Sequence, residues 1–424
     1  MATTSQGEAV RPLGAFERTI DFYMRRNPLQ FSLVAEIDRP VAPAELAAAL
    51  VELGRLHPML GVTVDRTEPV AVYRTTGAAI PVTTLAEGTP WQTVVADEQT
   101  RPISPVPGTS SVRAVLLPRG PRCAIVLTFA HQITDGVGGL RALLDLVAVL
   151  DGAELAPGGV PEPLEDLLAR EVKAQEPTGT LSTPDTSNAP DVTDAPSPAA
   201  DDPRMGAVGE LAPFSGEVPH LQALALDREL TTRLVDRCRR ESTSVHAALC
   251  AAAAVVFHRR GREFVRILTP MDLRRACGLP DEVVNRFAGA RTASEAHEAD
   301  DFWKLARGAR ASLAVQRAPG ALKAAGAALV EHGPTSADEA EAMMGAATAA
   351  DIQITNLGVA RPRSRGADTL TALWGPGQIT QLRGEHVLGV VTVAGRLRMT
   401  ELTHDPVAGL VGEMAAVLAE ACGG

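Results

Sequence analysis

Disulfide, zinc and export signals are missing from this 424-residue chain. Its five cysteines are scattered and form no Cys-x-x-Cys pair, a spacing typical of reduced thiols in a cytosolic protein. The N-terminus, MATTSQGEAV, has no basic segment and no apolar segment, so we expect no signal peptide and a cytoplasmic location. The longest apolar run, Ala247–Phe257, is shorter than the ~20 residues that a membrane-spanning helix needs.

The chain also has no excess of positively charged residues. The formal net charge of −11 argues against a nucleic-acid partner. No Gly-x-Ser-x-Gly segment occurs, so the chain lacks the nucleophile elbow of a serine hydrolase. With 424 residues and a hydrophobic fraction of 45%, the composition indicates a globular protein made of two packed halves. We expect a monomer without a membrane span.

One stretch, CAIVLTFAHQITDGVGGL at residues 123–140, combines a buried strand with polar residues at its end. The apolar run Ala124 to Ala130 predicts the strand, and it stops at His131. Asp135 and Gly136 follow in a Gly-rich turn, before a helix with a leucine-rich face. Strand ends of this kind are where α/β proteins place binding and catalytic residues.

Several interpretations of His131 and Asp135 compete. A neutral imidazole could take a proton from an attacking hydroxyl, amine or thiol, with Asp135 bracing the turn. Alternatively, His131 is a structural histidine and Asp135 only caps the next helix. A dinucleotide loop fits poorly, because Arg141 stands where the third glycine of G-x-G-x-x-G belongs. Two possible ligands are too few for a metal site, so we expect no metal.

The segment HQITDG and its preceding strand resemble the HHxxxDG signature of the condensation-domain and chloramphenicol-acetyltransferase-like superfamily. The second histidine of that signature, the catalytic one, falls on His131. The first falls on Ala130, where this chain departs from the pattern. The opening, from RPLGAFER to RNPLQFSLVAEI, particularly resembles stand-alone polyketide-associated acyltransferases.

The resemblance implies an α/β fold of two chloramphenicol-acetyltransferase-like halves, each a mixed β-sheet flanked by helices, which form a V with a tunnel between them. We place the halves at residues 11–155 and 216–424. Residues 156–215 are rich in proline and acidic side chains, and we expect a largely disordered linker there. His57, which precedes Pro58 at a predicted helix end, is interpreted as structural.

In the second half, Asp272-Leu-Arg and the stretch from Asn285 to Gly289 resemble further superfamily motifs. The strand that ends at Asn356 and the pair Trp374 and Gly375 also match, and the resemblance implies that they line the tunnel. A hairpin turn is predicted at Ala394–Gly395.

The resemblance also implies an acyltransferase mechanism. His131 would deprotonate an alcohol or amine, Gly136 would offer backbone N–H groups to the oxyanion, and Asp135 would hold the loop. Candidate arginine partners of Asp135 are Arg11, Arg113 and Arg274.

The donor would be acyl-coenzyme A or an acyl-phosphopantetheine carrier protein, with no tightly bound cofactor. The acceptor would be a small-molecule alcohol or amine. An arginine-rich stretch that includes Arg274 and Arg275 could dock the acidic carrier or bind coenzyme A phosphates. Cyclisation or dehydration in the same tunnel, and a non-catalytic binding role, stay open as alternatives.

Overall fold

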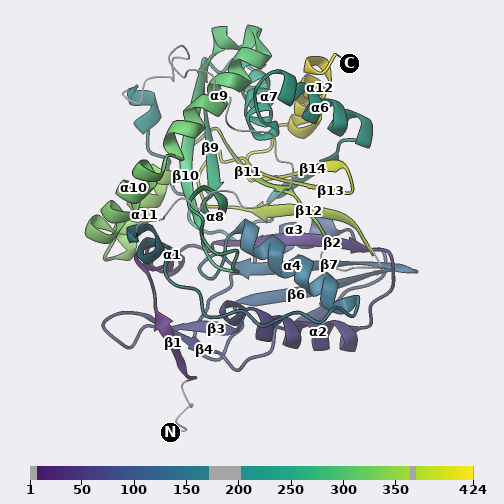
Figure 1. The fold of residues 1–424 in the computed structure, drawn as a ribbon, viewed down its shortest axis with the longest axis vertical. Helices are drawn as coiled ribbons and strands as arrows, with labels where there is room; N and C mark the ends of the chain where they lie inside the picture. The colour runs from purple at the N-terminus through teal and green to yellow at the C-terminus, as the bar shows by residue number, and fades with distance from the viewer. Residues whose placement is uncertain (1–6, 171–201, 363–368, 424) are drawn as a thin grey trace.

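Two α/β halves lie one above the other along the long axis of the computed structural model (Figure 1). The structure describes residues 7–170, 202–362 and 369–423. About half of the predicted disordered linker, residues 171–201, lies outside the described residues. Its described flanks hold a short helix, α5 (Leu164–Ala169), and a 3-10 turn, η3 (Pro203–Gly206). Because Leu164 and Leu168 are buried against the second half, the start of the predicted linker is ordered.

The first half is built on a five-stranded mixed sheet in the order β12-β2-β7-β6-β5, in which β12 spans Leu370–Gln378, beside a three-stranded sheet in the order β1-β4-β3. Its elements are β1 (Ala9–Pro12), α1 (Ala15–Met24), β2 (Gln30–Ile37), α2 (Pro43–Leu56), η1 (Pro58–Gly61), β3 (Val62–Asp65), β4 (Val72–Thr75), β5 (Val82–Thr84), α3 (Trp91–Gln99), β6 (Val112–Arg119), β7 (Arg122–Ala130) and α4 (Gly136–Leu150).

Strand β7 lies between β2 and β6 and is buried on both faces, as its continuous apolar run predicts. Successive side chains of a strand point to opposite faces. Ile125 and Leu127 therefore pack in the cluster formed with α2 and α4, whereas Val126 packs with Trp91 and Val95 of α3 on the other face. The strand is thus fixed by two cores, and it delivers His131 at its end.

The second half is built on a six-stranded sheet in the order β10-β9-β11-β13-β14-β8. Its elements are β8 (His220–Ala225), α6 (Arg228–Arg240), α7 (Val245–Arg259), β9 (Phe264–Asp272), α8 (Leu273–Ala276), β10 (Phe287–Glu295), η4 (Ala296–Asp300), α9 (Phe302–Gln316), α10 (Pro319–His332), α11 (Ala337–Thr348), β11 (Ile352–Val359), β13 (Val387–Val393), β14 (Arg396–Thr403) and α12 (Leu410–Ala421).

Helix α7 forms the centre of the second core, because every residue from Ala247 to His258 is buried. Its small alanine side chains allow α9 and α12 to pack closely on either side. The predicted hairpin between β13 and β14 is confirmed: Val393 pairs with Arg396, and Ala394 and Gly395 both have positive φ.

No single point in the sequence separates the two halves. Strand β12 (Leu370–Gln378) comes from the second half of the sequence, yet it pairs antiparallel with β2 at the edge of the first sheet. Figure 1 shows this strand lying along β2, beneath the second sheet. The crossing ties the halves together and brings β11 and β12 beside the start of α4, where Leu357 and Pro376 face Gly136.

Candidate active site

His131 follows the last residue of β7, and its ring lines a cavity between the two halves. Its backbone N–H donates to the carbonyl of Leu29 at 2.9 Å. The imidazole lies between Phe31 and Phe287, with ring centroids 5.3 and 5.5 Å away. Burial lowers the pKa of His131, although its own carbonyl, Asp135 and Asn285 partly oppose the shift. The imidazole is therefore neutral at pH 7, as a general base must be.

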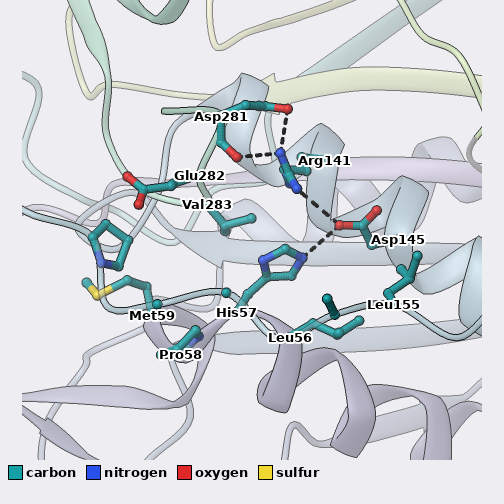
Figure 2. Close-up of a pocket in the computed structure, with 14 residues that line it drawn as sticks. Leu56, His57, Pro58, Met59, Arg141, Asp145, Leu155, Asp281, Glu282 and Val283 are labelled. Atoms are coloured by element: carbon teal, nitrogen blue, oxygen red, sulfur yellow. Dashed lines mark hydrogen bonds and ion pairs between the residues drawn. The ribbon is translucent and has the colours of Figure 1, made fainter. Parts of the chain in front are cut away.

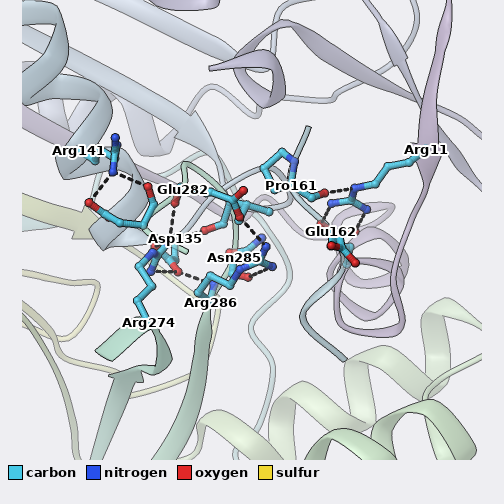
Figure 3. A network of polar contacts seen from close by, with 12 residues as sticks. Arg11, Asp135, Arg141, Pro161, Glu162, Arg274, Glu282, Asn285 and Arg286 are labelled. Atoms are coloured by element: carbon cyan, nitrogen blue, oxygen red, sulfur yellow. Dashed lines mark hydrogen bonds and ion pairs between the residues drawn. The ribbon is translucent and has the colours of Figure 1, made fainter. Parts of the chain in front are cut away.

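Asp135 joins the two halves and caps α4 (Figure 3). Its carboxylate accepts hydrogen bonds from the guanidinium of Arg274 at 3.0 and 3.1 Å. It also accepts from the backbone N–H groups of Gly138 and Arg286, each at 2.7 Å. Both side chains of the ion pair are almost fully buried. Asp135 is thus committed to holding the loop and is not placed to relay protons.

Of the three candidate arginines, only Arg274 contacts Asp135. Arg11 pairs instead with Glu17 at 2.6 Å, and Arg113 pairs with Glu98.

The predicted docking role is wrong for Arg274. Its residue exposure is only 5%, and its guanidinium also binds Asp272 at 2.8 Å, so it cannot present a charge at the surface. The adjacent Arg275 is exposed, and its docking role stays a prediction. Elsewhere in the arginine-rich stretch, Arg233 and Arg260 form ion pairs with nearby glutamates.

Asn285 is a site residue whose function the sequence did not indicate. Its side-chain N–H groups donate to the carbonyls of His131 and Gln132, at 3.0 and 3.1 Å. The residue is 1% exposed and comes from the second half of the chain. Asn285 therefore positions the backbone of the His131 loop, and the superfamily pattern from Asn285 to Gly289 was the only signal for it.

The central cavity has a volume of about 190 Å³ and is lined by residues from both halves. Gly136 lines it at the first turn of α4, and a Cβ on Gly136 would lie 3.0 Å from Leu357 Cδ2, so a larger residue there would displace the leucine side chain of β11. The N-terminal turn of α4, where the helix carries a partial positive charge, therefore borders this space. Asn356 also lines the cavity.

The expectation that Trp374 and Gly375 line the tunnel is not met. The indole of Trp374 packs against Trp91, with centroids 5.0 Å apart, and its N–H donates to Glu36 at 2.7 Å. Gly375 has φ of 105°, and a Cβ there would lie 2.6 Å from the carbonyl of Ser32, so this residue packs against β2. The following residue, Pro376, lines the cavity instead.

A second cavity, of about 270 Å³, surrounds His57 (Figure 2). His57 Nε2 lies 2.9 Å from a carboxylate oxygen of Asp145, and Arg141 lies 3.6 Å from the same oxygen. The residues that line this cavity in the described part of the chain include no serine, threonine or cysteine, so the His–Asp pair has no hydroxyl or thiol to activate. The pair joins the end of α2 to α4, in agreement with a structural role for His57.

Metal coordination finds no support in the described ranges, where no group of three or more His, Cys, Asp or Glu side chains could hold an ion. Over the same residues, no helix is both long enough and apolar enough to cross a bilayer.

One known protein family matches part of the second half of the chain. The family described as phthiocerol/phthiodiolone dimycocerosyl transferase C-terminus matches residues 215–372. No curated protein sequence matches significantly.

Solved structures match over almost the whole chain. Polyketide synthase associated protein 5 from Mycobacterium tuberculosis has a TM-score of 0.64 at 16% identity, covering 98% of this chain and 99% of its own. Trichothecene 15-O-acetyltransferase from Fusarium sporotrichioides has a TM-score of 0.64 at 13% identity, covering 97% and 94%. The first condensation domain of the calcium-dependent antibiotic synthetase has a TM-score of 0.64 at 15% identity, covering 97% and 96%. The chain therefore has the two-lobed fold of the condensation-domain and chloramphenicol-acetyltransferase-like superfamily, as its sequence resemblance predicted.

Proposed function

We propose that this protein is an acyltransferase that moves an acyl group from a thioester to the hydroxyl or amine of a small-molecule acceptor. The observation that carries the proposal is the neutral, buried imidazole of His131, which lines a largely apolar cavity between two halves. Its loop is held by Arg274 through Asp135 and by Asn285. A preorganised base in a water-poor site is what general-base catalysis of acyl transfer requires.

The proposed reaction needs no acyl-enzyme. His131 takes the proton of the acceptor's hydroxyl or amine as its oxygen or nitrogen attacks the thioester carbonyl. The tetrahedral intermediate carries a negative oxygen, which the backbone N–H of Gly136 at the α4 terminus can stabilise. The C–S bond then breaks, and the proton on His131 passes to the departing thiolate. The products are the ester or amide and a free thiol.

The family and structural matches support this reaction class, because they include proteins described as a dimycocerosyl transferase, an acetyltransferase and a condensation domain. By analogy, the donor is an acyl-coenzyme A or an acyl group on the phosphopantetheine of a carrier protein. In either case the donor binds as a substrate.

Thiol release provides the test. Acyl-coenzyme A and acylated carrier proteins would be offered with alcohols and amines, and free thiol and product mass would be measured. Release should require both an acceptor and His131, and His131→Ala should lower turnover by about 10²–10⁴-fold. His57→Gln is the matched control, because it alters the other His–Asp pair, and it should keep turnover.

Full activity in a folded His131→Ala variant would remove the base from the mechanism. Absence of thiol release from every donor by the wild-type protein would reject acyl transfer. It would favour cyclisation, dehydration or a non-catalytic role.

A further inference from the structure

Asp272 is the last residue of β9, and it lines the same cavity as His131. In the antiparallel pair of β9 and β10 it lies directly opposite Phe287, so the two side chains share one face of the sheet. The ring of Phe287 also lines the cavity, and its centroid lies 5.5 Å from that of the His131 imidazole. The carboxylate of Asp272 therefore borders the space in front of the proposed base.

Only one oxygen of this carboxylate is bound within the protein. Asp272 Oδ1 accepts hydrogen bonds from Arg274 Nη1 at 2.8 Å and from the backbone N–H of Arg274 at 3.3 Å. Among the residues that the structure describes, none donates to Oδ2, and this oxygen is not buried. The side chain keeps 30% of its surface exposed. Oδ2 is thus an open hydrogen-bond acceptor on a cavity-lining residue.

The charges beside the cavity do not balance. Arg274 carries one positive charge, and its Nη1 contacts two carboxylates, Asp135 at 3.0 Å and Asp272 at 2.8 Å. The fully buried Arg286 pairs with a neighbouring glutamate at 3.0 Å and does not supply the missing charge. No lysine or arginine is present among the described residues of the lining. Burial lowers the pKa of His131, so the imidazole adds no positive charge at pH 7.

This excess of one negative charge indicates the chemistry of a ligand. A carboxylate that is withdrawn from water without a counterion is costly, and a cation is attracted more strongly here than in bulk water. A primary ammonium group fits the open oxygen of Asp272, because it has both the charge and the N–H donors for a charge-assisted hydrogen bond.

We propose that Asp272 binds an ammonium group of the acceptor, and that the acceptor is an amino alcohol. The inference rests on the proposed acyl transfer and names the class of its acceptor. The bound ammonium has no lone pair, so the hydroxyl at the other end of the acceptor gives its proton to His131 and attacks the thioester carbonyl. The C–S bond then breaks, the proton passes from His131 to the departing thiolate, and the product is an ester.

The structural contacts of Asp272 can be kept while its charge is removed. Its side chain caps the short helix α8, and asparagine offers the same oxygen and is a favourable capping residue. Asp272→Asn therefore separates binding of the acceptor from the positioning of Arg274. Asp281→Asn is the matched control. It makes the same change of charge in the segment between α8 and β10, on a residue that pairs with Arg141 and does not line the central cavity.

Binding of linear aminobutanol and of pentanol tests the inference without turnover, because the two molecules have nearly the same shape and differ in charge. Titration calorimetry of the wild-type protein should show that aminobutanol binds roughly 10- to 100-fold more tightly. Asp272→Asn should remove this preference, whereas Asp281→Asn should keep it. Asp272→Ser, which also offers a capping oxygen, replaces the asparagine variant if that variant does not fold.

Turnover gives a second measurement. In thiol-release assays, Asp272→Asn should lower the ratio of kcat/KM for aminobutanol to kcat/KM for pentanol by a similar factor, roughly 10- to 100-fold. The wild-type product with aminobutanol, identified by mass spectrometry after an acid quench, should be the ester.

Equal binding of both probes by the wild-type protein would overturn the inference. So would a preference for aminobutanol that persists in the folded Asp272→Asn and Asp272→Ser variants, or an amide as the product. These outcomes leave the proposed acyl transfer in place as long as thiol release requires an acceptor and His131. In contrast, a preference that is lost with Asp272, combined with no thiol release from any donor, would support the ammonium site and reject acyl transfer.

Discussion

Replacing Arg274 with glutamine should destabilise the protein and misplace its catalytic loop. The substitution removes two charge-assisted hydrogen bonds to Asp135, and it also removes donors to the backbone carbonyls of Glu282 and Val284. Breaking a buried ion pair by removing one partner costs about 3–5 kcal/mol. Asp135 keeps the backbone N–H groups of Gly138 and Arg286, so we expect about 3 kcal/mol.

Urea unfolding followed by circular dichroism measures this cost, and the loss should appear as a midpoint lowered by up to about 1 M, because the urea m-value of a chain this long is about 3 kcal/mol/M or more. Arg275→Gln is the control: the neighbouring arginine is exposed, and its replacement should change the free energy of unfolding by less than about 0.5 kcal/mol. A double-mutant cycle with Asp135→Asn should give a coupling energy of about 2–3 kcal/mol. A cost below about 1 kcal/mol for Arg274→Gln, or no coupling, would refute the view that this pair locks the two halves at the site.

Three further predictions follow from the site. Because burial lowers the pKa of His131 and the base acts unprotonated, kcat/KM should be constant above neutral pH and fall only in acid; an apparent pKa above about 6.5 in its pH profile would contradict this. His57→Gln should lower the thermal unfolding temperature, because it removes the partner 2.9 Å from Asp145, yet leave kcat within about twofold; loss of kcat in the folded variant would make His57 part of the chemistry. Trp374→Phe should cost about 1–3 kcal/mol of stability through the lost hydrogen bond to Glu36, measured by urea unfolding, with kcat within about twofold; loss of kcat in the folded variant would place Trp374 at the reaction centre.

The sequence predicted well those features that depend on burial or turn chemistry within a few adjacent residues. The strand before His131 and the turn at Ala394–Gly395 were predicted from adjacent residues, and helix capping was one of the alternatives that these residues left open for Asp135. Trp374 shows what local sequence patterns cannot predict. It lies in a motif that resembles a tunnel segment, but its side chain points to the face of the first sheet that packs against α3. The alternation of a strand gives two faces, and the sequence does not say which of them meets the cavity.

The amino-acid sequence by itself determined the two α/β halves, the buried β7 with His131 at its end, and the superfamily resemblance. Each of these depends on hydrophobic periodicity or on a motif contained in one short segment. Tertiary structure alone decided which arginine meets Asp135, that Asn285 holds the His131 loop, and that β12 joins the first sheet. These contacts join residues more than a hundred positions apart. Their choice depends on how two separately buried cores pack together, and no local pattern of side chains carries that information.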